Sequence, residues 1–268
     1  MALTAGAPQA RAERGRPFPV NWLARAGWIA LALYTVYAAS LFQLTWARFV
    51  EGLENGRHFV ARMFPPLFGK WDLLWTGMTE SLEIAVISTV LGVALALPVG
   101  LLAARNLMPA WISWPARWLI ALCRSFHPVI VAILFVKAVG FGALAGIMAL
   151  VVASIGFIAK LFAEAIEEIS LKQVEAVRAT GAGFLNVLIM GVQPQVLARF
   201  IGFATYQLDS NLRNSTMVGI VGGGGIGATL FTAFQRFDYD YVLTILIAII
   251  TLIMIGEVLS GWIRRTFQ

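Results

Sequence analysis

Asp209 and Arg213 are charged residues inside an otherwise apolar stretch of the sequence, and Asn211 and Ser215 lie beside them. On a helix, a spacing of four places both charges on one face, within reach of each other. A charge inside a long apolar helix costs several kcal/mol unless it is paired or faces water. Two compatible interpretations are open: an ion pair that fixes helix packing, and a polar face along an aqueous path where Arg213 offers its guanidinium fork to an oxyanion.

A glycine-rich segment follows, and Gly222, Gly224 and Gly227 match the G-x-G-x-x-G dinucleotide-binding pattern. We reject that interpretation, because the motif requires a βαβ unit with a strand before it and an acidic residue after it. In apolar surroundings, these glycines instead let the backbone pack closely or re-enter the apolar layer. The sequence also lacks a Walker A motif, so any use of ATP depends on another chain.

The composition indicates a protein of the membrane. Of 268 residues, 59% are hydrophobic and 13% are charged, and the mean hydropathy is +0.80. The apolar residues form long blocks instead of the amphipathic stripes that build a soluble core. The net charge of +6 comes without a basic cluster interleaved with aromatics, which argues against nucleic acid as a partner. With one cysteine, Cys123, and two distant histidines, His58 and His127, the sequence predicts neither a disulfide nor a metal site.

Six apolar stretches have about the 20 residues that a helix needs to cross the hydrocarbon layer. They cover residues 26–47, 84–104, 118–136, 143–159, 200–221 and 241–262, and the second begins near Ser81. In the third, His127-Pro128 is expected to kink or break the helix, because proline removes a backbone donor. We therefore predict an all-α, polytopic helical bundle with about six transmembrane helices. It forms one domain, 26–268, behind a cytoplasmic N-terminal segment, 1–25.

An even number of spans places both termini on one side of the membrane. With the termini inside, about twice as many Lys and Arg residues lie in the cytoplasm as outside, as the positive-inside rule requires. The largest internal loop is then 160–199. Its pattern predicts an amphipathic helix, a sharp turn at Gly181, and a second short apolar helix over 184–192 that Pro194 ends. Such a helix-turn-helix has the size to dock into a groove of a partner protein.

This loop resembles the EAA loop of ABC importer permeases. Glu175-Ala176, Gly181 and Pro194 fall at the family's spacing, and the departures are Val177, Gly191 and Gln193. Other stretches are similar to the phosphonate-type permeases within that family, and the resemblance covers roughly residues 60–262. Those stretches are Phe64-Pro65-Pro66, Ala96-Leu97-Pro98, the run from Leu102 to Asn106, and Arg213 with Ser215 ahead of Gly219 and 221–227.

The resemblance implies a permease in the bacterial inner membrane that works as a homodimer. Two cytoplasmic ATPase subunits would carry ATP and Mg, a periplasmic binding protein would deliver phosphonate, phosphite or a related phosphorus oxyanion, and this chain would bind no cofactor and catalyse no reaction. The residues that the resemblance assigns to coupling with the ATPase are Glu175, Ala176, Gly181, Phe184, Leu185 and Pro194. The candidate translocation path is Asp209, Asn211, Arg213 and Ser215, and the candidate gate is Gly222, Gly223, Gly224, Gly225 and Gly227.

Three alternatives are open at this point. The loop and the glycine-rich segment are also similar to methionine-type permeases, although Arg213 favours an anion. A self-contained secondary transporter would show internal repeats and half-helices broken at the midplane. A membrane-embedded enzyme would need clustered His, Asp or Glu, and only Asp209 lies deep in a predicted span.

Overall fold

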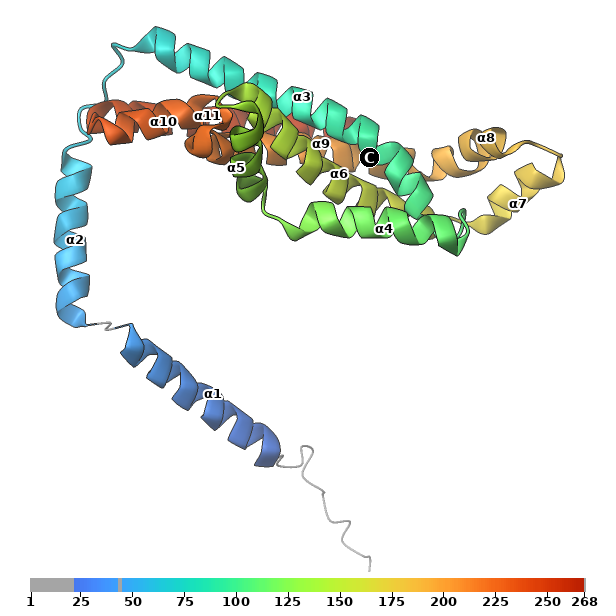
Figure 1. Ribbon diagram of the computed structural model, residues 1–268, viewed down its shortest axis with the longest axis horizontal. Helices are drawn as coiled ribbons and strands as arrows, with labels where there is room; N and C mark the ends of the chain where they lie inside the picture. The colour runs from blue at the N-terminus through green and yellow to red at the C-terminus, as the bar shows by residue number, and fades with distance from the viewer. Residues whose placement is uncertain (1–21, 43–44, 268) are drawn as a thin grey trace, which may run out of the picture. The chain divides into compact units, whose positions relative to one another are not determined.

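The computed structural model describes residues 22–42 and 45–267, which form helices and their connections (Figure 1). The chain divides into two units, Met1–Phe59 and Val60–Gln268. The predicted segment 1–25 lies almost wholly outside the described residues.

The first unit contains α1 (Trp22–Leu41) and most of α2 (Trp46–Ala61). The side chains of α1 are largely apolar and exposed within this chain, as in Trp28 and Leu33. The predicted continuous span over 26–47 is wrong at its end, because α1 stops at Leu41 and a separate helix begins at Trp46. Hydropathy follows side chains, and a break in the backbone hydrogen bonds leaves no mark on it. By length and composition, α1 and α2 qualify as a span only together.

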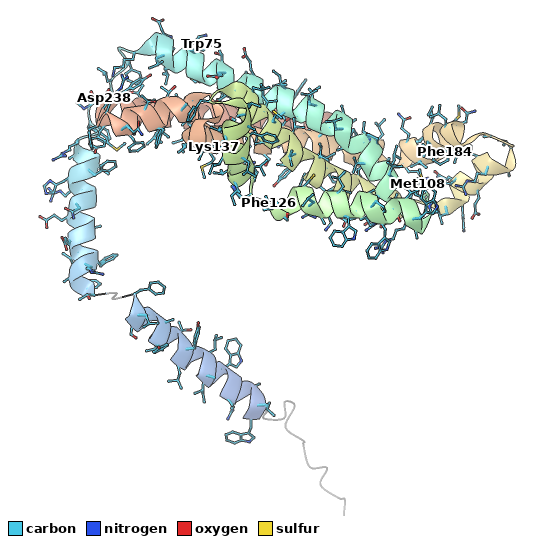
Figure 2. All side chains as sticks on the ribbon, in the orientation of Figure 1. Trp75, Met108, Phe126, Lys137, Phe184 and Asp238 are labelled. Carbon is cyan, nitrogen blue, oxygen red and sulfur yellow. The ribbon has the colours of Figure 1, made fainter. Side chains whose placement is uncertain are left out.

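The second unit holds four helices long and apolar enough to cross a membrane. They are α3 (Trp71–Ala103), α6 (Ala143–Glu167), α9 (Gln193–Val218) with the turns on either side of it, and α11 (Tyr239–Phe267). With the broken pairs α1–α2 and α4–α5 the count of possible spans reaches six, which agrees with the predicted all-α bundle. Figure 2 labels Trp75 and Asp238 at one end of this unit and Met108 and Phe184 at the other, which we call the loop end.

Small residues let α3 and α6 approach closely along their length. Gly92 of α3 leaves so little room that a Cβ there would collide with Ser154 of α6. At Gly100, a Cβ would lie 3.0 Å from the Ala159 carbonyl oxygen and 2.9 Å from the Phe162 ring. In a membrane such close approach replaces the hydrophobic effect as the source of helix association. α9 packs against this pair and completes the framework that positions the polar residues.

The third predicted span is broken where the sequence predicts it. α4 (Ala110–Ser125) and α5 (Pro128–Val139) meet at 90°, and Phe126 marks the corner in Figure 2. His127 caps α5, since its Nδ1 accepts a hydrogen bond of 3.3 Å from the Val129 amide. Pro128 takes the first helical position, where a missing N–H costs nothing.

Three other predicted boundaries differ from the structure. α3 begins at Trp71 instead of near Ser81, and α6 continues past the predicted end of its span at residue 159 to Glu167, through part of the predicted amphipathic segment. A helix does not end where the hydrocarbon ends, because its backbone bonds are independent of side-chain polarity. Pro194 does not end the helix that begins at Phe184: α8 (Phe184–Val187) passes through the π-helical turn η1 (Leu188–Val192) into α9. The turn shifts the hydrogen bonding, so that Gln193 donates to the Leu188 carbonyl and Pro194 falls in the first turn of α9.

Candidate functional site

A buried hydrogen-bond network joins α9 to α3 and α6. Asn211 is 0% exposed, and its Nδ2 donates to Thr89 Oγ1 of α3 and to Ser154 Oγ of α6, both at 2.9 Å. Gln207, one turn earlier, donates to Asn211 Oδ1 and to Ser154 Oγ, again at 2.9 Å. Since Asn211 and Gln207 also bond each other, the network is continuous across α3, α6 and α9 and stabilises the packing of the three helices.

Asp209 and Arg213 lie on another face of α9. One guanidinium nitrogen of Arg213 donates to Asp209 Oδ2, so the ion pair predicted from the four-residue spacing forms. The Asp209 side chain is 9% exposed, and its other oxygen, Oδ1, has no partner among the described residues. The Arg213 side chain is 43% exposed, which leaves part of the guanidinium accessible from outside the chain. The pair thus holds one buried anion and presents one accessible cation.

The four candidate path residues therefore separate into two groups. Asn211 and Ser215 are both 0% exposed, and the Ser215 hydroxyl donates to the Leu212 carbonyl at 2.8 Å within its own helix. Only Arg213 of the four reaches the surface of this chain, with Asp209 beside it. A role on a path stays a prediction, and Arg213 is the residue through which it is best tested.

The glycine-rich segment makes a sharp reversal between α9 and α10 (Ile226–Gln235). It starts in the π-helical turn η2 (Gly219–Gly223). Gly222, Gly224 and Gly225 have φ values of 98°, 80° and 73°, a backbone conformation that residues other than glycine rarely adopt. Gly227 sits so close to α9 that a Cβ would collide with the Thr216 carbonyl oxygen. The predicted close backbone packing is thereby confirmed.

Two contacts fix this segment between α3 and α6. The Ser81 hydroxyl accepts a hydrogen bond of 2.8 Å from the Ile226 amide, and the Gly222 carbonyl accepts one of 2.9 Å from the Gly142 amide, just before α6. A Cβ on Gly224 would lie 2.6 Å from a carboxylate oxygen of Glu80. The segment is therefore attached both to α3 and to the start of α6.

At the loop end, α7 (Leu171–Ala179) forms the first half of the predicted helix-turn-helix. Val174, 1% exposed, anchors it on a core formed by α6, η1 and α9. Gln195 binds the start of the loop, since its side chain accepts from the Ser170 amide at 3.0 Å and donates to the Gly191 carbonyl at 2.6 Å. Gly181 has φ of +79°, which confirms the predicted sharp turn.

The outer face of this loop is apolar and uncovered within the chain. Phe184, Leu185 and Met190 are 50%, 67% and 71% exposed, and Glu175 and Ala176 are exposed on α7. Large apolar groups gathered on an exposed loop indicate a contact with a partner protein or with the membrane. Five of the six candidate coupling residues lie on this loop, and Pro194 follows at the start of α9.

The polar residues that bind these segments together carry no motif by which the sequence would assign them this role. Ser81, Thr89, Ser154, Gln207 and Gln195 are polar residues whose partners come from distant parts of the chain. A lone Ser or Thr in an apolar stretch does not reveal a partner on another helix, because its hydroxyl can equally bond the backbone of its own helix. Among the described residues, no three His, Cys, Asp or Glu side chains gather where a metal ion could bind.

Known proteins resemble this chain in both sequence and fold. Residues 96–268 match the family described as "Binding-protein-dependent transport system inner membrane component". The chain is 42% identical to the phosphate-import permease protein PhnE of Mycolicibacterium smegmatis over 76% of its own length, but it spans only 38% of that relative. It is 34% identical to the phosphite transport system permease protein PtxC of Stutzerimonas stutzeri, covering 94% of this chain and 93% of the relative. An inward-facing structure of the MetNI methionine ABC transporter aligns with a TM-score of 0.65 and 25% identity, over 74% of this chain and 98% of that one.

Proposed function

Because the chain belongs to the family of binding-protein-dependent transport system inner membrane components, we propose that it is the permease of an ABC importer for phosphonate, phosphite or a related small phosphorus oxyanion. The observation that carries the proposal is the similarity to a phosphite permease over nearly the full length of both chains. Arg213 supports an anionic cargo, because a guanidinium binds a phosphorus oxyanion through two parallel hydrogen bonds.

The exposed face of the α7–α8 loop supports a cytoplasmic ATPase subunit as the partner at the loop end. An apolar patch of Phe184 and Leu185 beside the acidic Glu175 suits a groove in that subunit. Since Gln195 and Val174 fix the loop to α6 and α9, a displacement of the docked loop would be passed to both helices. In this account, ATP binding favours an outward-open state through different contacts in the two states, and hydrolysis restores the inward-open state.

The same account makes the glycine-rich segment a gate and the membrane domain a homodimer with both termini in the cytoplasm. A path between two copies would be lined by the exposed face of α9, where Arg213 lies. A periplasmic binding protein would deliver the anion at the end opposite the loop, near Asp238. The self-contained secondary transporter considered from the sequence is incompatible with membership of a binding-protein-dependent family.

ATPase activity tests this proposal directly. The chain is purified in lipid with its ATPase subunit, and activity is measured with the binding protein empty, loaded with phosphite or a phosphonate, or loaded with methionine. We expect stimulation only by the protein that carries the phosphorus oxyanion. Methionine is the second candidate cargo because the aligned structure is a methionine transporter, and stimulation by a methionine-loaded protein alone would replace the first proposal with it.

A further inference from the structure

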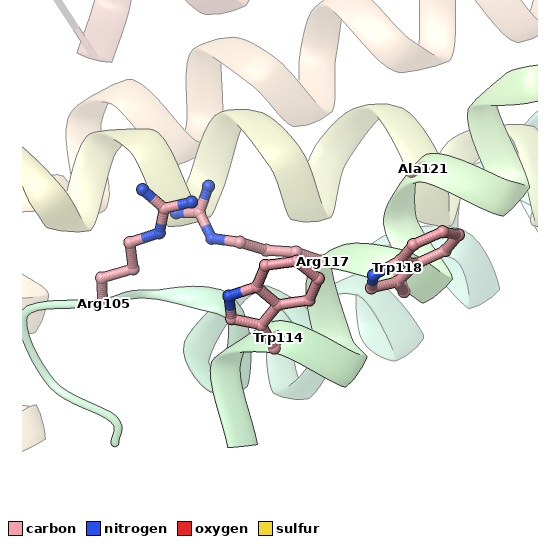
Figure 3. Close-up of a pocket in the computed structure, with 5 residues that line it drawn as sticks. All are labelled: Arg105, Trp114, Arg117, Trp118 and Ala121. Carbon is pink, nitrogen blue, oxygen red and sulfur yellow. The ribbon is translucent and has the colours of Figure 1, made fainter. Parts of the chain in front are cut away.

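We propose that a hollow beside α4 binds the phosphate headgroup of an anionic phospholipid. The hollow has a volume of about 340 Å³ and is lined by Arg105, Trp114, Arg117, Trp118 and Ala121 (Figure 3). A second hollow of about 230 Å³ shares Arg117 and Ala121 with it. The second hollow adds Arg124, Lys160 and Glu164 to the lining. The proposal rests on the chain being a membrane protein and not on its cargo.

The charges around the two hollows do not balance. Four cations, Arg105, Arg117, Arg124 and Lys160, face two carboxylates, which leaves a net charge of +2. Lys160 pairs with Glu164 at 3.4 Å, and Arg117 donates to Glu167 Oε1 at 2.5 Å. The guanidinium groups of Arg105 and Arg124 have no acidic partner among the described residues.

One carboxylate oxygen, Glu167 Oε1, binds both the backbone of Arg105 and the side chain of Arg117. Glu167 Oε1 accepts from the Arg105 backbone amide at 2.8 Å as well as from Arg117. Both side chains line the hollow, and in the view of Figure 3 their guanidinium groups extend toward each other. Two cations kept close together repel each other, and an anion bound between them removes that repulsion while accepting several charge-assisted hydrogen bonds.

The hollow lies at the level where two spanning helices end. Arg117 Nε donates to the carbonyl of Ala103, the last residue of α3, at 3.0 Å, and its other contact, Glu167, is the last residue of α6. The apolar stretches of the same two helices end just before Arg105 and Lys160, and such a change from apolar to charged residues marks the boundary between hydrocarbon and water. The arginines therefore have the depth of lipid phosphates, where basic pockets between helices bind anionic headgroups.

The tryptophans favour a lipid over a free anion. Trp111, Trp114 and Trp118 follow one face of α4 and are 76%, 61% and 67% exposed. Indoles at this level are typical of the membrane interface, where they contact the upper part of the acyl chains. One wall of the hollow thus suits a phosphate and the other suits the glycerol and acyl chains attached to it. A free anion would use only the first wall.

Native mass spectrometry of the full-length chain tests the proposal, with phosphatidylglycerol and phosphatidylcholine titrated separately. We expect the wild-type chain to bind phosphatidylglycerol at least about fivefold more tightly than phosphatidylcholine. Arg105→Gln should weaken phosphatidylglycerol binding about fivefold, which corresponds to the ~1 kcal/mol that one arginine contributes near a lipid surface. Arg105 is chosen because its backbone amide, which the change preserves, makes the bond to Glu167. Arg265→Gln in α11, outside both hollows, is the matched control and should change nothing.

Arg124→Gln provides a second variant in case the first does not fold, with a loss of similar size expected. Equal affinity for the two lipids, or an equal loss in the Arg265→Gln control, would refute the site. Displacement of phosphatidylglycerol by millimolar inorganic phosphate would assign it to a free anion instead. The same spectra report the number of subunits, so a dimer that dissociates on Trp114→Ala would show that a second copy covers this face and would overturn the lipid assignment.

Discussion

Replacing Asn211 by leucine distinguishes a packing role from a role on the transport path. The side chain is fully buried and takes part in three hydrogen bonds of 2.9 Å to Thr89, Ser154 and Gln207. Leucine has the same branching and number of heavy atoms but is somewhat larger, so the change removes the bonds without opening a cavity. A hydrogen bond between membrane helices contributes about 0.6 kcal/mol on average, and three of them predict a loss of ~2 kcal/mol in the free energy of unfolding.

The surroundings of Asn211 keep the loss in the free energy of unfolding near the ~2 kcal/mol of the three hydrogen bonds alone. After the change, Gln207 still donates to Ser154, Ser154 still donates to the Leu150 carbonyl, and Thr89 still donates to the Ala85 carbonyl. None of these groups is left wholly without a partner, so the larger penalty for an unsatisfied buried group does not apply.

Unfolding of the purified chain by SDS, followed by tryptophan fluorescence, measures the loss. Asn214→Leu is the matched control, because Asn214 is half-buried and, within the described part of the chain, its side chain bonds only Ser210 of its own helix, at 3.3 Å. We expect Asn211→Leu to be destabilised about 30-fold in the folding equilibrium, with normal uptake per folded molecule, and the control to be close to wild type. Wild-type stability combined with lost uptake would refute the packing role and return Asn211 to the path.

Three further changes test the other parts of the proposed site. Arg213→Lys keeps the charge but loses the guanidinium fork, so uptake of the phosphorus oxyanion should fall about tenfold in a transport assay, as expected for a lost hydrogen bond to a charged group. Glu175→Ala combined with Gly181→Ala removes an exposed contact and strains a residue with φ of +79° by ~1 kcal/mol, so ATP hydrolysis should continue while uptake per ATP falls. Gly227→Ala places a Cβ against the α9 backbone and should destabilise the chain by about 1–3 kcal/mol in the SDS assay. Gly183→Ala, which meets nothing within 4 Å and has no positive φ, is the control for both glycine changes.

Unchanged uptake by an assembled Arg213→Lys protein would remove the guanidinium from the path. Normal uptake per ATP in the double variant would refute the coupling role of the loop. If Gly227→Ala and Gly183→Ala are equally stable, the close approach of the glycine-rich segment to α9 is not a determinant of stability.

The sequence was most informative where a residue restricts its own backbone or its own helix face. Pro128 after His127 predicted the break between α4 and α5, Gly181 predicted the turn, and the spacing of Asp209 and Arg213 predicted their ion pair. Each of these depends on local geometry, which a sequence records directly.

The sequence was misleading where the outcome depends on hydrogen bonding between or along helices. Pro194 looked like a helix end, but a π-helical turn rearranges the preceding backbone bonds and the helix continues. Asn211 looked like a neighbour of Arg213 on one polar face, whereas the two-residue spacing directs it toward α3 and α6. The partners of Asn211 are separated from it by 122 and 57 positions, so periodicity within one helix could not identify them.

Uptake into proteoliposomes is the most direct test of the proposed function. The chain is reconstituted with its ATPase subunit, ATP is enclosed on the side of the loop end, and radiolabelled phosphite or methylphosphonate is added outside with the binding protein. We predict accumulation that requires ATP, the binding protein and the phosphorus oxyanion together. Accumulation without ATP, or an equal rate for methionine with its own binding protein, would contradict the account.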